Sequence, residues 1–160
     1  MKNDKFLIGI VAGIVLLAIV AVVVVMLRQP GEENYIADDT PAGVVHNYFL
    51  AIQRKDYEKA YSYLSDDLDN KPDLDEFIRD MNIYGYDRQA SLSIGQTTPG
   101  DVRAQVEISI TTYNTGGLFD NNQYTSHDTV YLQATADGSS WGITQFPYPY
   151  WQYDWTQAVD

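Results

Sequence analysis

Residues 41 to 68, PAGVVHNYFLAIQRKDYEKAYSYLSDDL, open the helical half of the chain and decide its fold. Thr40 precedes Pro41, which is typical of a helix that begins with an N-cap and a proline in its first turn. Apolar residues then recur at helical spacing as far as Arg54 and Lys55, two cations that suit a helix C-terminus. The apolar stripe of this expected helix consists of Val44, Val45, Tyr48, Phe49 and Ile52.

Two more amphipathic helices are expected after the first. Asp56 is a suitable N-cap for the second helix, whose apolar face would comprise Tyr57, Ala60, Tyr61, Leu64 and Leu68. Residues 73 to 76, DLDE, resemble a capping box that opens the third helix, and Gly85 is expected to end it. The inward residues of the third helix would be Leu74, Phe77, Ile78 and Met81.

After Gly85 the hydrophobic period changes from helical to two, which predicts strands. The clearest strand is VRAQVEISIT, residues 102 to 111, with Val106 and Ile108 on the buried face and Glu107 on the wet face. The other expected strands are residues 90–94, 129–136 and 141–146, and residues 113–123 are expected to form a loop. Helices followed by antiparallel strands indicate an α+β fold.

Before the helices lies an apolar segment, FLIGIVAGIVLLAIVAVVVVML, residues 6 to 27. Its 22 residues carry no charge and no polar side chain. A helix of this length spans about 33 Å, enough to cross the hydrocarbon core of a bilayer. A cleaved signal peptide is a poorer interpretation, because the apolar run is too long and no small-residue cleavage site follows it. The segment is predicted to be a transmembrane helix, and the bilayer is its expected partner.

The flanking charges predict the orientation of this helix. Lys2 and Lys5 precede it, whereas Arg28 is followed by two glutamates, so residues 1–5 are expected in the cytoplasm and the rest outside, at a plasma membrane. Residues 28–40 are expected to be a short linker. Gly9 and Gly13 form a G-x-x-x-G pair, which either permits close contact with another membrane helix or reflects the ordinary frequency of glycine there.

The charge and cysteine content narrow the class of protein. The chain has a net charge of −12, and the part from residue 28 onward contains 21 acidic residues but only 8 Lys and Arg. Nucleic acid is therefore not an expected partner. An exported domain without any cysteine fits a prokaryotic envelope better than a eukaryotic secreted protein.

Residues 41 to 68 and the ending DGSSWGITQF, residues 137 to 146, resemble NTF2-like domains, also called the SnoaL or ketosteroid-isomerase-like superfamily. The resemblance covers residues 41–148. It implies three helices packed in the concavity of a curved antiparallel sheet, with a cone-shaped pocket. Enzymes of this superfamily place an Asp base, a Tyr/Asp pair or a His/Asp pair in the cone, and none of these positions maps onto this chain. The resemblance therefore implies a fold and no particular activity.

Few residues suggest catalysis or metal binding. His46 lies beside the apolar stripe of the first helix, and His127 precedes Asp128, but adjacent residues on a strand point to opposite faces. The acidic run of residues 66–76 lacks the pattern of a calcium loop and is interpreted as helix caps and solvated charge. No catalytic residue, metal or cofactor is predicted.

The most unusual segment is FPYPYWQYDW, residues 146 to 155, because six of its ten residues are aromatic. This segment overlaps residues 149–160, which are expected to form a separate tail after the domain. The rings either complete the core or form an exposed surface that binds a protein or stacks on sugars. The favoured function is a non-catalytic, membrane-anchored domain that binds a membrane or envelope protein, such as an accessory subunit. The alternatives are binding or acid–base chemistry on a small apolar ligand in the cone, and binding of cell-wall glycan. The expected exterior contact residues are Leu118, Phe119, Tyr148, Tyr150, Trp151 and Trp155.

Overall fold

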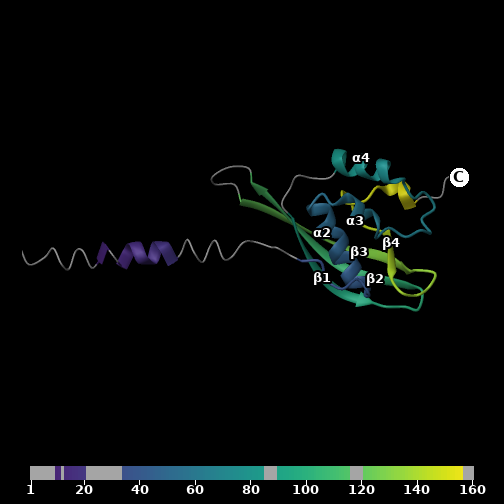
Figure 1. Cartoon of the computed structure of the whole chain (residues 1–160), viewed down its shortest axis with the longest axis horizontal. Coiled ribbons are helices and arrows are strands. Elements are labelled where there is room, and N and C mark those ends of the chain that lie inside the picture. Colours follow the sequence, from purple (N-terminus) through teal and green to yellow (C-terminus); the bar gives the residue numbers. More distant parts are fainter. Residues whose placement is uncertain (1–9, 12, 21–33, 85–89, 116–120, 157–160) are drawn as a thin grey trace, which may run out of the picture. The chain divides into compact units, whose positions relative to one another are not determined.

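The computed structural model describes residues 10, 11, 13–20, 34–84, 90–115 and 121–156 (Figure 1). The chain divides into two compact units, Met1–Asn34 and Tyr35–Asp160. The second unit begins inside the predicted linker, and it contains the whole of the predicted tail.

In the first unit, residues 10, 11 and 13–20 are helical. No helix formed by the described residues is both long enough and apolar enough to cross a membrane. Both ends of the predicted span, residues 6–9 and 21–27, lie outside the described residues, and so does Gly9. Gly13 lies within the described helical turns.

The first helix of the second unit forms where the sequence predicts it. Helix α2 spans Pro41–Gln53, and the hydroxyl of Thr40 caps it by accepting a hydrogen bond from the Gly43 backbone N–H at 3.1 Å. All five residues of the predicted stripe are buried. Two backbone N–H groups, of Arg54 and Lys55, bond back to carbonyls of the last turn, which ends the helix at the predicted place.

The second helix is much shorter than predicted. Helix α3, Tyr57–Tyr61, begins at the expected cap, because Asp56 accepts from the Lys59 N–H at 3.3 Å, but it ends after five residues. Beyond it the chain pairs with the last strand instead: Ser65 donates to Ile143 O at 2.9 Å, and Ile143 donates to Tyr63 O at 2.8 Å. The prediction that the helix continues to Leu68 is wrong, because these tertiary hydrogen bonds replace the helical ones.

The third helix, α4, spans Leu74–Tyr84. The Asp73 carboxylate accepts from the Glu76 backbone N–H at 2.8 Å, as expected for its N-cap. Phe77 and Met81 are fully buried. The predicted stop at Gly85 lies outside the described residues.

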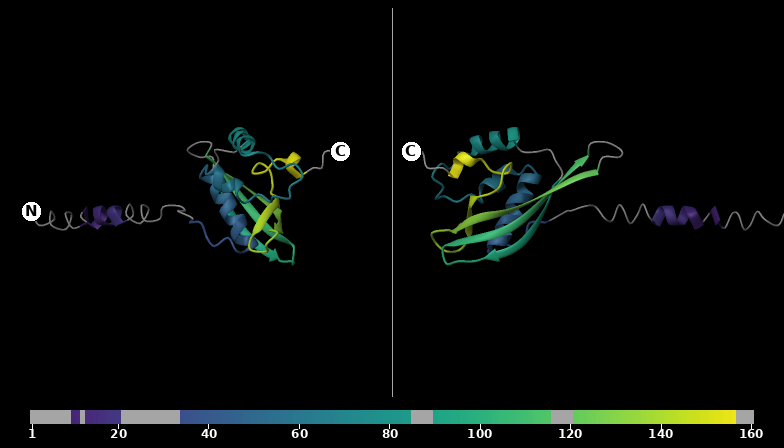
Figure 2. Two further views of the ribbon diagram at one scale, coloured as in Figure 1. Left: turned by 45° about the vertical axis from the view of Figure 1, so that its right-hand side comes forward. Right: turned by 180° about the vertical axis from the view of Figure 1, so that it is seen from behind.

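A four-stranded antiparallel sheet follows, in the order β1-β2-β3-β4. Its strands are β1 Ala90–Thr98, β2 Arg103–Thr115, β3 Asn121–Ala134 and β4 Trp141–Gln145. Helix α2 lies across one face, and no described helix covers the opposite, outer face (Figures 1 and 2). The predicted alternation in β2 is confirmed, because Val106 and Ile108 are buried and Glu107 is exposed.

Strands β2 and β3 are longer than predicted. The segment 113–123 was expected to be a loop, yet Thr115 still pairs with Asn121, so only residues 116–120 separate the two strands, and they lie outside the described residues. Strand β3 begins at Asn121 rather than Thr129. Residues 111–115 and 121–126 are polar or tyrosine throughout, so the alternation that reveals a half-buried strand is missing from the sequence.

The aromatic tail packs back onto the helices. A turn closed by the Tyr150 N–H on Pro147 O, at 3.1 Å, leads toward the short helix η1, Tyr153–Thr156, which lies beside α4 (Figures 1 and 2). Tyr150, Trp151 and Trp155 are all buried. The tail is thus part of the hydrophobic core, as the first of the two interpretations proposed.

Candidate functional site

A cone-shaped pocket was expected on the face of the sheet that carries α2, and buried aromatic side chains pack over much of this face. We call them the aromatic cluster. Its ring centroids lie 4.9 Å apart for Tyr48 and Phe146, and 5.1 Å apart for Trp151 and Trp155. Its members are Tyr48, Phe49, Phe77, Phe146, Tyr150, Trp151 and Trp155. Four of these seven come from residues 146–155, which therefore pack on the face where the resemblance implied a pocket.

Tyr48 links this cluster to the tail. Its hydroxyl donates a hydrogen bond to the backbone carbonyl of Tyr150 at 2.5 Å. Burial raises the pKa of Tyr48 far above its ordinary value, so the phenol stays neutral. The Tyr48 hydroxyl therefore has a structural role, because its proton takes part in the hydrogen bond to the tail backbone.

This burial corrects the expected exterior surface. Tyr150, Trp151 and Trp155 belong to the core, so their rings do not face a partner on the folded domain. They are inside because Pro147 and the following turn direct the chain back over α2 and α4. Leu118 and Phe119 lie outside the described residues.

An exposed aromatic pair remains at the edge of the tail. The rings of Tyr148 and Tyr153 are stacked, with centroids 6.1 Å apart and planes 13° apart. Both side chains are exposed. Tyr148 is thus the described member of the expected contact set that stays on the surface, and Tyr153 joins it.

A shallow pocket of about 320 Å³ lies next to Tyr148. Asp128 lies across the strand pair from Ile108, on the face that carries α2, yet it is exposed. The pocket is lined by Ile110, Thr112, Tyr124, Ser126, Asp128, Tyr148, Pro149 and Tyr150. An acid–base enzyme of the expected kind needs a carboxyl group shielded from water, and this carboxyl group faces solvent.

The two histidines lie on different elements, His46 on α2 and His127 on β3. His46 is half-buried in α2. His127 is exposed on β3, where its Nδ1 is 2.8 Å from the Ser109 hydroxyl across the strand pair. Among the described residues, no carboxylate is bonded to His127 to orient it, and the pair lies on an open sheet face. The geometry is that of a cross-strand polar pair.

The acidic run of residues 66–76 is used for structure. Asp66 forms an ion pair with Lys71 at 2.6 Å, which lowers the pKa of Asp66. Asp67 accepts a hydrogen bond from the Gln133 side chain at 2.7 Å, and Asp73 caps α4. Among the described residues, no group of three or more acidic or histidine side chains converges in a way that could hold a metal ion.

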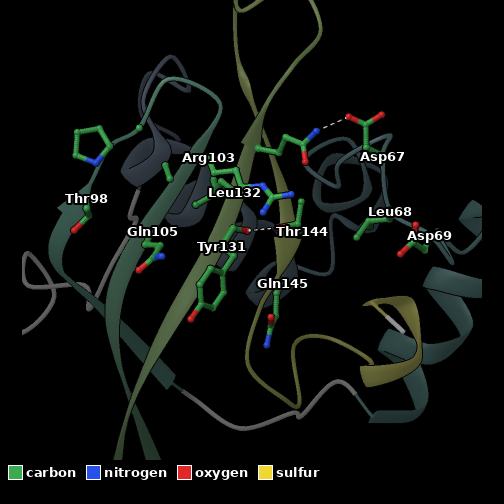
Figure 3. A pocket seen from close by; sticks show the side chains of 14 residues that line it. Asp67, Leu68, Asp69, Thr98, Arg103, Gln105, Tyr131, Leu132, Thr144 and Gln145 are labelled. Atoms are coloured by element: carbon green, nitrogen blue, oxygen red, sulfur yellow. Dashed lines mark hydrogen bonds between the residues drawn. The ribbon is translucent and has the colours of Figure 1, made fainter. Parts of the chain in front are cut away.

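A larger pocket lies on the outer face of the sheet (Figure 3). Its volume is about 550 Å³, and its walls are the loop of residues 67–69 and the β1–β2 turn. Gln105, Tyr131 and Gln145 lie side by side on three neighbouring strands at its floor (Figure 3). The remaining side chains of the lining are mainly polar: Asp67, Asp69, Thr98, Arg103, Gln133 and Thr144, with Leu68, Pro99, Ala104 and Leu132.

The sequence alone does not identify this site. The alternation in residues 102 to 111 puts Arg103 and Gln105 on the wet face together with Glu107, but it does not reveal which residues of the other strands lie beside them. That juxtaposition depends on register, and two of the three ladders contain irregularities, one between Ile94 and Thr97 and one between Tyr131 and Leu132. Alternating polar residues identify a wet face, whereas only the register assembles them into a site.

No protein-family model matches the chain, and no curated protein matches it either. Solved structures do match. A SEC-C motif containing protein from Rhodopseudomonas palustris shares 14% sequence identity with a TM-score of 0.52, over 69% of this chain and 79% of the other. A SEC-C motif containing protein from Psychrobacter arcticus shares 15% identity with a TM-score of 0.51, over 71% of this chain and 63% of the other.

A third solved structure comes from Thiobacillus denitrificans. It is described as a calcium/calmodulin-dependent protein kinase type II association domain, and it shares 9% identity with a TM-score of 0.52. The match covers 68% of this chain and 93% of the other. At such low identity these likenesses show the fold alone. They support an α+β fold, with helices packed on an antiparallel sheet, for the second unit of this chain.

Proposed function

We propose that this chain is a single-pass membrane protein whose domain, residues 35–160, lies outside the cytoplasm and binds a membrane or envelope protein without catalysing a reaction. One observation carries the non-catalytic part of this proposal. Aromatic side chains of the tail are buried on the face of the sheet where the resemblance implied a substrate pocket, and the pocket that remains there is shallow, with an exposed Asp128.

The membrane part of the proposal is supported by the sequence of residues 6–27 and by the start of the domain. Tyr35 donates a hydrogen bond to Asp56 at 3.2 Å, and both backbone polar groups of Ile36 bond to Asn47. These contacts leave only residues 28–34 between the apolar segment and the domain. Seven residues reach at most about 25 Å when fully extended. The partner is therefore to be sought in the membrane or close to it.

Single-cysteine labelling tests the topology, and the natural absence of cysteine makes each label unique. The variant Asp101→Cys places a thiol on the exposed β1–β2 turn, and it should react with an impermeant reagent added to intact cells. The variant Asn3→Cys should react only after the cells are opened. The opposite labelling pattern would overturn the proposed orientation.

The exposed pair of Tyr148 and Tyr153 is the surface that we propose for the partner, since interface energy concentrates in a few aromatic side chains. The double variant Tyr148→Ala with Tyr153→Ala should lose a membrane or envelope protein that co-purifies with the full chain after mild detergent extraction. The matched control is Tyr113→Ala, which removes an exposed tyrosine at a different place, on β2. Equal recovery of the partner with both variants would exclude this pair as the docking surface.

A further inference from the structure

The outer face of the sheet carries a row of four polar side chains, one from each strand. Thr98 pairs with Gln105, Gln105 with Tyr131, and Tyr131 with Gln145. The row therefore crosses the whole sheet, with neighbours about 4.8 Å apart and about 14 Å between its ends. We call it the outer row, and it forms the floor of the 550 Å³ pocket (Figure 3).

A second line of polar groups borders the outer row. Arg103 pairs with Gln133 on the next strand, and the Gln133 side-chain NH₂ group donates to Asp67 at 2.7 Å. This bond fixes the orientation of one amide and leaves its carbonyl oxygen able to accept. Among the described residues, no ion pair joins Arg103 to a carboxylate, so its guanidinium is a further donor toward the pocket.

The chemistry of these groups selects a class of ligand. A primary amide, a phenol and a threonine hydroxyl can each donate and accept hydrogen bonds, so the outer row presents both functions at every strand. A ligand that satisfies them must itself carry closely spaced groups that both donate and accept. Vicinal hydroxyls of a sugar do this, and the Tyr131 ring offers an apolar surface to the C–H groups of a sugar ring.

Other ligand classes fit this pocket poorly. An apolar ligand would bury the amides and hydroxyls without hydrogen bonds, which is costly. A polyanion would meet Asp67 and Asp69 at the pocket wall, with Arg103 as the single cation of the lining. A neutral, hydroxyl-rich molecule avoids both penalties.

We propose that the outer row binds a neutral saccharide laid across the strands, with successive sugar rings over successive strands. The spacing of neighbouring strands is close to the length of one pyranose ring in an extended glycan, so each ring would meet one or two of the four side chains. The proposal concerns the face opposite the aromatic cluster, and it does not depend on the anchor or on the partner proposed above. It also moves sugar binding away from the tail tryptophans, which lie in the core.

The test is binding of defined tetrasaccharides to the full chain, measured by isothermal titration calorimetry. The probes are cellotetraose, chitotetraose and maltotetraose, which are neutral and differ in linkage. The detergent must lack a sugar headgroup, because a maltoside would compete for the site. At least one probe should bind, and the variants Tyr131→Ala and Gln105→Ala should each weaken that binding tenfold or more.

Matched controls lie on the same face, outside the pocket. Tyr113 and Tyr131 have similar exposure, 43% and 40%, and Gln123 lies across from Tyr113 on β3 as Gln105 lies across from Tyr131. Tyr113→Ala and Gln123→Ala should change the affinity less than twofold. If Tyr131→Ala lowers the unfolding temperature, Gln105→Ala and Gln145→Ala decide the question, since both remove only exposed amides.

Two results would overturn the proposal. The first is that none of the three tetrasaccharides binds at millimolar concentration. The second is that the control variants weaken binding as much as the row variants do, which would place the site elsewhere. Loss of the co-purifying protein is measured with Tyr148 and Tyr153, so a failure of either proposal is distinguishable from a failure of the other.

Discussion

Asn47 shows how one buried polar side chain sets the start of the domain. It is 1% exposed, in the middle of an apolar helix. Its Oδ1 accepts from the Ile36 backbone N–H at 2.9 Å, and its Nδ2 donates to the Ile36 carbonyl at 2.8 Å. A buried amide is stable only when it is bonded in this way. These two hydrogen bonds hold the residues just before α2 against the domain. The composition of the expected linker gives no sign of this contact.

At the same scale, Asp137 makes a prediction about pH. Its carboxylate accepts from the Thr135 hydroxyl at 2.6 Å, and from the Ser139 hydroxyl and backbone N–H at 2.7 and 3.1 Å. These hydrogen bonds lower the pKa of Asp137 to about 2. A carboxyl group whose pKa is depressed by folding stabilises the native state above its unfolded pKa, about 3.9, and this contribution is lost as the pH falls through the folded value.

The pKa of Asp137 can be measured by NMR titration of its carboxyl carbon. The variant Thr135→Val removes the largest cause of the shift, so it should raise the pKa of Asp137 toward the ordinary range. Asp137→Asn should remove this part of the pH dependence of unfolding between about pH 4 and pH 2. An unchanged pKa in Thr135→Val would show that the hydroxyl does not stabilise the carboxylate.

At the scale of elements, β2 separates the core from the outer face. Its even-numbered residues Ala104, Val106, Ile108 and Ile110 are buried under α2 and the tail. Its odd-numbered residues face the other way and include Gln105 of the outer row. A slip of one residue in register would exchange these two sets, so burial of the apolar set also fixes the position of the pocket.

Two neighbouring substitutions in β2 test this division. Ile108→Ala should lower the free energy of unfolding by about 2–5 kcal/mol, because it removes buried methyl groups and leaves a cavity. Glu107→Ala, next to it on the exposed face, should change it by at most about 0.5 kcal/mol. Chemical denaturation measures both, and similar losses for the two variants would contradict the register.

Elements whose signals are local could be predicted from the sequence. The cap at Thr40, the proline at 41 and the stripe of α2 are local signals, and so is the alternation in β2. Elements whose structure depends on a distant partner could not be predicted. Leu64 has helical spacing, but hydrogen bonds to β4 draw its segment out of the helix. The outer row could not be predicted for the same reason, because each of the four strands contributes one residue and only their pairing brings these residues together.

At the scale of the whole molecule, the two ends of the domain depend on each other. The bond from Tyr48 to Tyr150 joins residues 102 positions apart. Phe77 of α4 packs on Trp155 with ring centroids 5.4 Å apart. The tail therefore supplies the part of the core that α2 and α4 cover.

Truncating the tryptophans of the tail should therefore destabilise the whole domain and not only change its surface. Trp151→Ala and Trp155→Ala should each cost about 3–5 kcal/mol of unfolding free energy. Trp151 should depend on packing alone, because its indole N–H has no hydrogen-bond partner among the described residues. Denaturation curves test this, with Tyr148→Ala as the control at an exposed ring. If the tryptophan variants were as stable as the control, the tail would not be part of the core.

The long separation along the chain between α2 and these rings also has a consequence for biosynthesis. A ribosome that adds about 5–20 residues per second needs about 5–20 s to travel from Tyr48 to its partner Tyr150. During that time α2 has been made but the rings that cover it have not. The nascent domain thus remains without its native core until residues 146–155 have been made, and a translocation channel that accepts only unfolded chains would be able to transport it until then.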